Sequence, residues 1–479
     1  MEKKNKVTLF DRAFWRIMLP LALPIAMQNL LMTSFRLVDT LMIGRLGDVS
    51  IAAVGLAGYA SFFVELITFG VASGSAVFLA QYYGAGNVKG IRRTLGVMLI
   101  FVVPIGLLFT LLTMTFPEIV MKLFTNEPAL IDEGVRYLRY AALSYVSLTL
   151  NTAFGITLRC TENVKLPMWV SGFCALLNAG LNYLFIFGGP GVAAMGVAGA
   201  GLATAISSLA SPLLLLIISL IKRNTLIAPI RDLLDIGNGF LKEYWQRVLP
   251  VLLNEALWSL SIIGVNMVFG RMGTDNYAAL TVVRTIENIV FVFFVGICNA
   301  CNILVGKSIG AGNIALGKRY ALQFMMLIPV FGVILGGLVA LLRGQMISLF
   351  DISDSAVHAA KVMLLIYAVD VSIRNVPYLT VVGIFRAGGD TRRGLLCDGF
   401  VQYVIVLPTV VLCGLVWKLP FITTYLLMII VDDIGKICFT VPYFLSMKWI
   451  KPIAQNRDEI RLDAAVCAEE AALREYEEH

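Results

Sequence analysis

The sequence predicts an all-α integral membrane protein with twelve transmembrane helices in two six-helix bundles, related by a pseudo-twofold axis along the membrane normal. The first observation behind this prediction is composition: 58% of the 479 residues are hydrophobic and 14% are charged, whereas a soluble globular chain carries about 25% charged residues. The second is that the charges are clumped between apolar runs of about 20 residues, the length that crosses a bilayer core as a helix. The third is an internal repeat that relates the two halves of the chain.

The apolar runs are expected to be helices. Lipid offers backbone groups no hydrogen-bond partner, and no run alternates with the period of a barrel strand. In chain order the expected spans cover residues 17–43, 51–82, 94–117, 138–158, 166–188, 192–221, 246–270, 276–306, 320–342, 361–385, 398–417 and 419–447. They leave no stretch of about 100 to 150 residues for a soluble domain. This excludes a receptor with an extracellular ligand domain and a transporter that carries its own ATPase.

The first span is too long for the core of a signal peptide and shows no small-residue cleavage site, so we expect it to stay uncleaved. With the N-terminus inside, the tails and inner loops hold 26 of the 38 lysines and arginines. By the positive-inside rule, both termini are expected in the cytoplasm and the protein in the cell (inner) membrane. The expected parts are an N-lobe (1–221), a cytoplasmic linker (222–245), a C-lobe (246–450) and a cytoplasmic C-terminal tail (451–479).

The two halves repeat at an offset of 226 residues. Leu23-Pro24 recurs as Leu249-Pro250, and Gly84-Ala85-Gly86-Asn87 recurs intact as Gly310-Ala311-Gly312-Asn313. Each half holds an even number of spans, so the halves share one orientation in the membrane. Two such bundles that rock around a midplane cavity are typical of a secondary transporter.

Eleven ionisable side chains lie inside the expected spans, beyond the first two residues of each, and each is costly there unless it is paired or wetted. Most have a partner of opposite charge three or four residues away on the same helix face. These local pairs are Arg36 with Asp39, Arg284 with Glu287, Asp370 with Arg374, and Asp432 with Lys436.

Glu65 and Glu255 have no basic residue within one helical turn. A carboxylate without a partner in the membrane takes up a proton readily, because desolvation disfavours its charged form, or it coordinates a bare cation. We therefore expect a functional role at Glu255, with a protonated structural hydrogen bond as the alternative. Glu65 is a secondary candidate, because the outer face of the long second span is expected to meet lipid headgroups.

Asp39 lies inside the first span, after Pro20 and Pro24, which can bend a helix or free backbone carbonyls. Pairing with Arg36 is one interpretation of this aspartate. The other is that Arg36 points elsewhere, because a three-residue spacing leaves about 60° between two side chains on a helix. Asp39 would then be a free membrane carboxylate.

Asn178 and Asn182 are spaced i,i+4 on one face of the fifth span, and Thr204 adds a hydroxyl on the sixth. Amide oxygens can ligate a cation but cannot titrate. Helix packing is the alternative role for these residues. The many Met and aromatic residues suit an apolar cavity that accepts organic cations, although most are expected simply to pack.

Several segments of the chain together resemble the multidrug and toxic compound extrusion (MATE) family. They are Leu21–Pro24, Val38–Gly47, Ala80–Asn87, Asn178–Phe187, Gly199–Thr204, Val305–Asn313 and Phe385–Thr391. The resemblance covers residues 10–450 and implies a twelve-helix, two-lobed exporter of amphipathic, often cationic compounds, driven by protons or sodium ions. It also implies that Asp39 is the key acid of the first helix, with Asn178 as a ligand, Thr204 as its partner, and Glu255 as the glutamate of a C-lobe cation site.

Two positions depart from the family pattern. Asn182 stands where one branch has an aspartate, which leaves Asp39 as the titratable group of the N-lobe. Asn375 stands where another branch has an aspartate on the tenth helix, and Asp370 lies five residues away, about 140° around the helix. Neither branch's site is complete, so a proton and sodium are both open as the coupling ion.

The expected function is therefore a cation-coupled antiporter, a monomer without cofactor or nucleic-acid partner, which exports amphipathic small molecules across membrane lipid by alternating access. Sodium, if used, is expected at Asp39 and Asn178 or at Glu255. The alternative is a lipid-linked oligosaccharide flippase of the same wider superfamily, whose basic groove would draw on Arg36, Arg284 and Arg374. An enzyme is not expected, because the chain has two histidines and no metalloprotease, hydrolase or P-loop motif.

Overall fold

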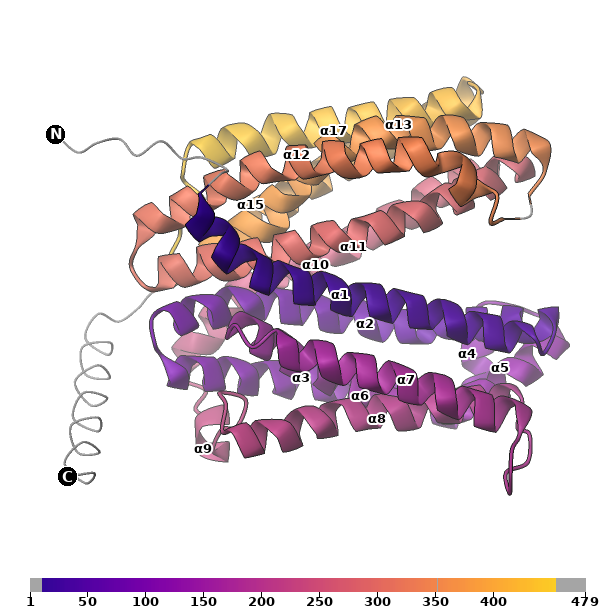
Figure 1. The fold of residues 1–479 in the computed structure, drawn as a ribbon, viewed down its shortest axis with the longest axis horizontal. Coiled ribbons are helices and arrows are strands. Elements are labelled where there is room, and N and C mark those ends of the chain that lie inside the picture. The colour runs from indigo at the N-terminus through magenta and orange to yellow at the C-terminus, as the bar shows by residue number, and fades with distance from the viewer. Residues whose placement is uncertain (1–10, 351, 454–479) are drawn as a thin grey trace.

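The computed structural model describes residues 11–350 and 352–453, and every named element within these ranges is a helix. Figure 1 shows two bundles lying side by side, the first half of the chain in one and the second half in the other. The predicted all-α, two-bundle fold is confirmed. The first ten residues and the predicted tail beyond Ile453 lie outside the described residues.

The first bundle consists of long helices joined by short loops. Its elements are α1 (Arg12–Gly44), α2 (Asp48–Gly84), α3 (Val88–Thr115), α4 (Pro117–Lys122), α5 (Pro128–Ala141), α6 (Ser144–Cys160), α7 (Lys165–Phe187) and α8 (Val197–Lys222). The helix α1 continues through both Pro20 and Pro24. Helices α5 and α6 meet at a bend of 52°, so the expected span 138–158 is one broken span that begins ten residues earlier than predicted.

The second bundle follows the short linker helix α9 (Ile230–Leu233). Its elements are α10 (Asn238–Gly270), α11 (Thr274–Gly310), α12 (Ile314–Ile347), α13 (Asp354–Tyr378), η1 (Leu379–Phe385), α14 (Arg386–Gly388), α15 (Thr391–Phe400), η2 (Val401–Val406), α16 (Leu407–Val411), η3 (Leu412–Val416) and α17 (Phe421–Leu445). The π-helical segments follow Pro377 and flank Pro408. Proline removes a backbone hydrogen bond, and the chain here widens into π turns.

Ten helices of the described part are long and apolar enough to cross a membrane, and α5 with α6 makes an eleventh span. The twelfth long helix is α17, whose middle carries Asp432, Asp433 and Lys436. Three charges in one span are expensive in lipid unless other protein groups bind them. The charges of α17 therefore need partners on neighbouring helices of the bundle.

The repeated Gly-Ala-Gly-Asn motif is a helix-to-helix turn. Gly86 and Gly312 have φ angles of 72° and 76°, in the left-handed region that glycine enters without strain. The following asparagines then cap the next helix: Asn87 Oδ1 accepts from the Gly90 amide at 2.7 Å, and Asn313 Oδ1 accepts from the Leu316 amide at 3.0 Å. The motif therefore recurs because both turns need the same backbone geometry.

The first glycine of each motif lies where the two bundles touch. A Cβ added to Gly84 would lie 2.0 Å from the carbonyl oxygen of Lys307, and one added to Gly310 would lie 1.9 Å from that of Gln81. Each residue of one contact lies 226 positions from its counterpart in the other, so the two contacts are the same contact viewed from opposite bundles. The pseudo-twofold axis passes between α2 and α11 at this point.

A second pair of glycine contacts obeys the same symmetry further along the interface. A Cβ added to Gly70 would lie 2.7 Å from the Leu252 side chain, and one added to Gly296 would lie 2.9 Å from the Ala26 Cβ. Residues 26 and 252 are again 226 apart. We call these four glycines, Gly70, Gly84, Gly296 and Gly310, the glycine seam. It joins α1 and α2 to α10 and α11 without room for a methyl group.

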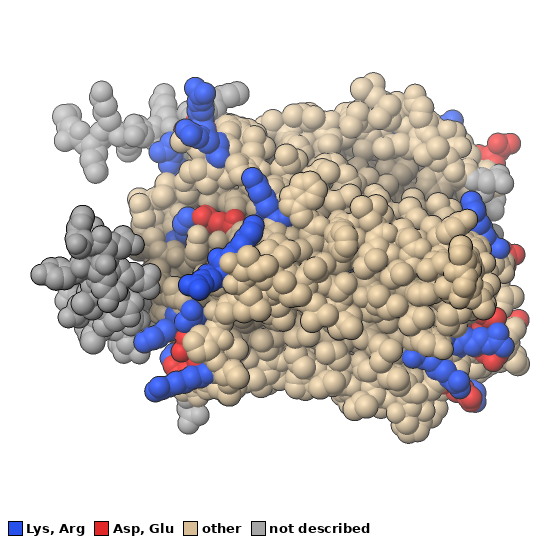
Figure 2. All heavy atoms as spheres, turned by 60° about the horizontal axis from the view of Figure 1, so that its bottom comes forward, with Lys and Arg blue, Asp and Glu red and all other residues tan. Residues whose placement is uncertain are grey.

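The glycine seam runs toward the end of the molecule that holds residues 85–87, 161–164, 223–237, 311–313 and 389–390, which we call the basic end. Figure 2 shows charged side chains gathered toward the two ends of the molecule, with a broad band between them that is nearly free of charge on the visible face. Such a band is expected where a protein meets the hydrocarbon core of a membrane.

Candidate functional site

Polar residues predicted in the first bundle meet at one place. Asp39 of α1 accepts a hydrogen bond through Oδ1 from Nδ2 of Asn182 on α7, at 2.6 Å. The same nitrogen lies 3.1 Å from Oδ1 of Asn178, whose own Nδ2 donates to Ser207 Oγ of α8 at 3.1 Å. The i,i+4 spacing places both asparagines on one helix face, and that face is turned toward α1 and α8.

Asn182 has an unsatisfied oxygen beside the carboxylate of Asp39. Its side chain is fully buried, and its Oδ1 has no hydrogen-bond partner in the described part of the chain. The amide cannot be turned without loss, because Nδ2 already faces two acceptors. Buried polar atoms are normally satisfied, so a carbonyl oxygen of this kind next to a carboxylate fits a hard cation such as sodium. A proton carried by Asp39 fits as well.

Thr204 joins the cluster through a residue that the sequence analysis missed. Tyr137 of α5 forms a hydrogen bond with Thr204 of α8 and lies close enough to Asp39 for an electrostatic interaction. Tyr137 was passed over because it precedes the expected span 138–158 by one residue, whereas α5 begins at Pro128. Ser207, one turn after Thr204, was also missed. We call Asp39, Tyr137, Asn178, Asn182, Thr204 and Ser207 the N-lobe cluster.

Arg36 does not pair with Asp39. Its Nη2 lies 2.8 Å from Oε1 of Glu65 on α2, with 68% and 36% of the two side chains exposed. Of the two interpretations of Asp39, pairing with Arg36 is therefore wrong, and the one in which Arg36 points elsewhere is confirmed. Glu65 also has a basic partner, which lies 29 residues away in the chain. The 60° between positions three apart on a helix is enough to direct Arg36 to a different neighbour, and Asp39 is left without a basic partner in its own turn.

Glu255 of α10 has a basic partner from another helix. Oε1 of Glu255 lies 2.7 Å from Nη2 of Arg386, whose side chain is 3% exposed. The Nη1 of the same arginine donates to Ser73 Oγ of α2 at 2.7 Å. The expectation of a carboxylate without a partner is wrong here, because the partner lies 131 residues away in the chain. Removing either charge of such a buried pair leaves the other uncompensated, which is costly.

Asp370 of α13 is only loosely paired with Arg374. Its side chain is 2% exposed, and its Oδ2 lies 3.8 Å from Nη1 of Arg374. That guanidinium lies closer, at 3.3 Å, to Oε2 of Glu287 on α11. Asn375 donates its amide at 2.9 Å to a backbone carbonyl of its own helix. In the described residues, neither Asp370 nor Asn375 is hydrogen bonded or ion paired to Glu255 or Arg386.

A second carboxyl group faces Asp370 from another helix. Asp433 of α17 is 7% exposed, and its carboxyl group interacts directly with that of Asp370. Neither oxygen of Asp370 has a hydrogen-bond donor in the described residues. Two carboxylates so close in a buried place cannot both be charged without a large repulsion. One proton shared between them removes the repulsion and supplies the missing donor.

The neighbouring charges of α17 are satisfied within the bundle. The predicted pair of Asp432 and Lys436 is present at 2.8 Å. Asp432 also accepts from Nε2 of Gln402 at 3.0 Å, and Gln402 accepts from the Ser261 hydroxyl at 2.8 Å. By contrast, the predicted pair of Arg284 with Glu287 gives way to other contacts. Arg284 donates to Asn266, and Glu287 pairs with Arg374.

The sequence and the fold can be compared with known proteins. The family model described as MatE matches residues 24–184 and, separately, residues 250–412. The two matches begin 226 residues apart, the offset of the internal repeat. Together they cover more than half of the chain.

Curated relatives match over most of the chain. The chain is 24% identical over 456 residues to the "Probable multidrug resistance protein NorM" of Thermotoga maritima, covering 93% of this chain and 95% of that protein. It is 26% identical over 368 residues to the "Probable multidrug resistance protein YoeA" of Bacillus subtilis, covering 76% and 78%.

Solved structures share the fold. A structure described as a crystal structure of MATE in complex with MaL6 has a TM-score of 0.82 at 19% identity, covering 93% of this chain and 100% of that one. Another, described as the outward-facing conformation of a multidrug resistance MATE family transporter, has a TM-score of 0.80 at 18% identity and covers 94% and 100%.

Proposed function

This chain belongs to the MatE family, and from that premise we propose that it exports amphipathic, often cationic small molecules in exchange for inward-moving protons or sodium ions. The names of the relatives, which are multidrug resistance proteins, support the export of drug-like compounds. The two-bundle fold supports alternating access. We further propose that it works as a monomer in the cell membrane with the basic end in the cytoplasm, in agreement with the positive-inside rule.

The N-lobe cluster is the observation that carries this proposal. Asp39 is an acid inside a span, five residues before the end of α1 at Gly44, without a basic partner in its own turn and next to the unsatisfied oxygen of Asn182. A proton or sodium ion bound there neutralises one charge in the membrane. A ligand shifts a conformational equilibrium only by binding one state better than the other. In our proposal the ion binds the state closed at the basic end, which then loses its substrate to the opposite side.

The arginines that a flippase groove would need support export instead. Arg36 is bound to Glu65, Arg374 to Glu287 and Arg284 to Asn266. An anionic sugar-linked headgroup would have to displace each of these partners. The lipid-linked oligosaccharide flippase is therefore the weaker proposal.

Efflux from proteoliposomes tests the proposed function. Vesicles that contain the purified protein are loaded with a fluorescent organic cation, and a pH gradient and a sodium gradient are imposed separately. We expect dye to leave faster under at least one gradient than from vesicles with no gradient, because ion entry is coupled to export. A rate of dye loss that neither gradient changes would refute cation coupling.

We also propose that Asp433 shares a coupling proton with Asp370 in the second bundle. Asp433→Asn is neutral at every pH and keeps a hydrogen-bond donor for Asp370. We expect it to lower pH-driven efflux by about 5- to 150-fold, the usual range of coupling energies, with little change in thermal stability. The rate of dye efflux under an imposed pH gradient measures this effect.

The matched control for this variant is Asp354→Asn, which removes an exposed acid at the start of the same helix as Asp370. It should transport normally. A structural role for the pair would show instead as a loss of thermal stability in Asp433→Asn. Unchanged pH-driven efflux in a stable Asp433→Asn protein would remove the second bundle from the coupling.

A further inference from the structure

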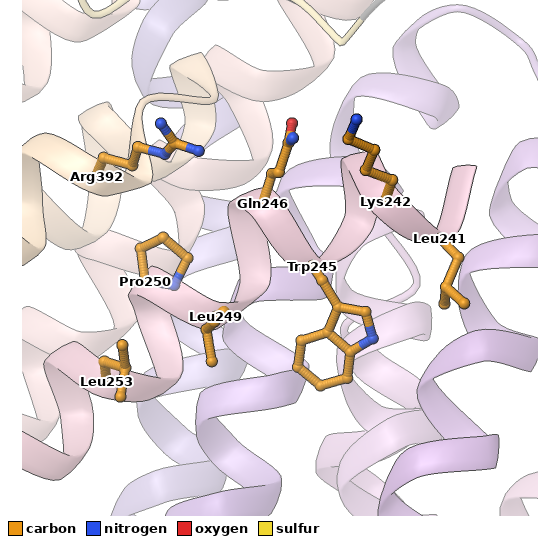
Figure 3. Close-up of a pocket in the computed structure, with 8 residues that line it drawn as sticks. All are labelled: Leu241, Lys242, Trp245, Gln246, Leu249, Pro250, Leu253 and Arg392. Carbon is orange, nitrogen blue, oxygen red and sulfur yellow. The ribbon is translucent and has the colours of Figure 1, made fainter. Parts of the chain in front are cut away.

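A groove opens beside α10 at the basic end. Its lining includes no residue of the N-lobe cluster and neither Asp370 nor Asp433. It has a volume of about 670 Å³ and is lined by residues of α10 together with Arg392 near the start of α15. In Figure 3 the polar ends of Lys242, Gln246 and Arg392 point to one side of the groove, while Trp245 and Leu249 extend to the other. The groove thus has a polar, basic mouth and an apolar floor.

The apolar part of the groove continues along a lipid-facing surface. Leu249 and Leu253 are 44% and 45% exposed, on a helix that is long and apolar enough to span the membrane. Positions 242, 246, 249 and 253 succeed one another at helical spacing, so they form one stripe along α10. A molecule bound at the mouth can therefore extend into the bilayer without leaving the protein surface.

The basic side chains at the mouth have no carboxylate to neutralise them in the described part of the chain. The nearby acids are bound to other bases: Asp232 to Arg92, Asp235 to Arg93, Glu243 to Arg247 and Asp390 to Lys451. The hydrogen bond from Arg93 also lowers the pKa of the Asp235 carboxyl below its usual value. Lys242 and Arg392 are left as two exposed positive charges on either side of Gln246.

We infer that this groove binds an anionic phospholipid, with its phosphate between Lys242 and Arg392 and an acyl chain along Leu249 and Leu253. Arginine and lysine are the usual partners of phosphate, and the amide of Gln246 adds a donor. Tryptophan is enriched where membrane proteins meet headgroups. A free phosphate would leave the apolar stripe uncovered, and an organic cation would meet like charges at the mouth.

The bound lipid would act on the junction of the two bundles. The ring of Trp245 packs edge-on against Phe101 of α3, with centroids 4.5 Å apart, and the neighbouring Tyr244 hydroxyl bonds to Ser75 of α2 at 2.7 Å. The groove therefore exists in this form only while the bundles are closed at the basic end. A lipid that binds it favours that closed arrangement by mass action.

Lipid binding to the purified full-length protein tests this inference without reference to transport. Phosphatidylglycerol, phosphatidylcholine and inorganic phosphate are added separately to the detergent-solubilised protein, and thermal unfolding and native mass spectrometry report binding. We expect phosphatidylglycerol alone to raise the unfolding temperature. The variant Lys242→Ala/Arg392→Ala should bind it about 30-fold more weakly. Each of the two basic residues attracts the headgroup about equally, and the two losses multiply in the dissociation constant.

The matched control is Lys222→Ala/Lys448→Ala, which removes two exposed charges at the same end but outside the groove. It should bind phosphatidylglycerol like the wild type. If the double groove variant fails to fold, Lys242→Gln and Leu249→Ser test the mouth and the stripe separately. Equal stabilisation by inorganic phosphate would show a simple anion site, and equal lipid binding by the groove variants and the wild type would overturn the inference.

Discussion

Asp39→Asn is expected to reduce ion-driven efflux to about a hundredth of the wild-type rate while leaving insertion and folding intact. The introduced amide still offers an oxygen to Nδ2 of Asn182, so the hydrogen bond between α1 and α7 is kept. What is lost is the charge that a proton or sodium ion neutralises. Substrate binding should survive, because the substrate can bind one conformation of the transporter without the ion. The ion is needed only to shift the equilibrium between the two conformations.

Two measurements separate these effects. Efflux from proteoliposomes under an imposed gradient reports coupling, and binding of the same fluorescent cation to the purified protein reports the substrate site. Asp48→Asn is the matched control, since it removes an exposed acid from the first turn of α2, nine residues further along. Wild-type efflux by Asp39→Asn under both a pH and a sodium gradient would exclude the N-lobe cluster as the coupling site.

Helical spacing and the family resemblance predicted much of the N-lobe cluster before the structure. The i,i+4 spacing of Asn178 and Asn182 requires a shared face, and the structure turns that face toward Asp39. Spacing could not predict Tyr137, because its helix begins earlier than the apolar run that marks the span. Polar helix ends are poorly marked by hydrophobicity alone.

The ion pairs were predicted less well, for a physical reason. Sequence spacing finds partners one turn away, whereas membrane helices also satisfy their charges across the bundle. Glu65 binds Arg36, which is 29 residues away in the chain, and Glu255 binds Arg386, which is 131 residues away. Only tertiary packing brings such groups together. The same limit hid the contact of Asp370 with Asp433, because each aspartate also has a basic residue within one turn of its own helix.

The internal repeat predicted more than the number of helices. Because two copies of one bundle face each other across a pseudo-twofold axis, any contact on the axis must occur twice. The glycines of the repeated motif meet that requirement at Lys307 and Gln81. The sequence showed that the motif recurs, but not that its first glycine lies against the backbone of the other bundle.

Gly310→Ala is expected to open the basic end. The new Cβ would lie 1.9 Å from the carbonyl oxygen of Gln81, and backbone cannot move aside as a flexible side chain can. Overpacking of this kind costs about 1–3 kcal/mol, but only in the arrangement where the bundles touch. The closed arrangement should therefore be depopulated about 5- to 150-fold relative to one in which the seam is parted, and efflux should fall with it.

Labelling of a buried cysteine measures this opening directly. Ser75→Cys places a thiol on α2 against Tyr244 of α10, in a background without Cys438 and Cys467. A membrane-impermeant maleimide should label it slowly in the parent and many times faster with Gly310→Ala, when added from the basic end. Gly84→Ala should behave alike, because its Cβ would lie 2.0 Å from the Lys307 oxygen at the symmetric contact.

The matched control is Gly58→Ala on α2, where an added Cβ would meet no other atom within 4 Å. It carries the same change in helix propensity, about 1 kcal/mol in favour of alanine, so any difference from Gly84→Ala reflects the contact between the bundles. Equal, slow labelling in all three glycine variants would show that the glycine seam does not hold the basic end closed. Fast labelling in Gly58→Ala as well would assign the effect to helix stiffness rather than to the seam.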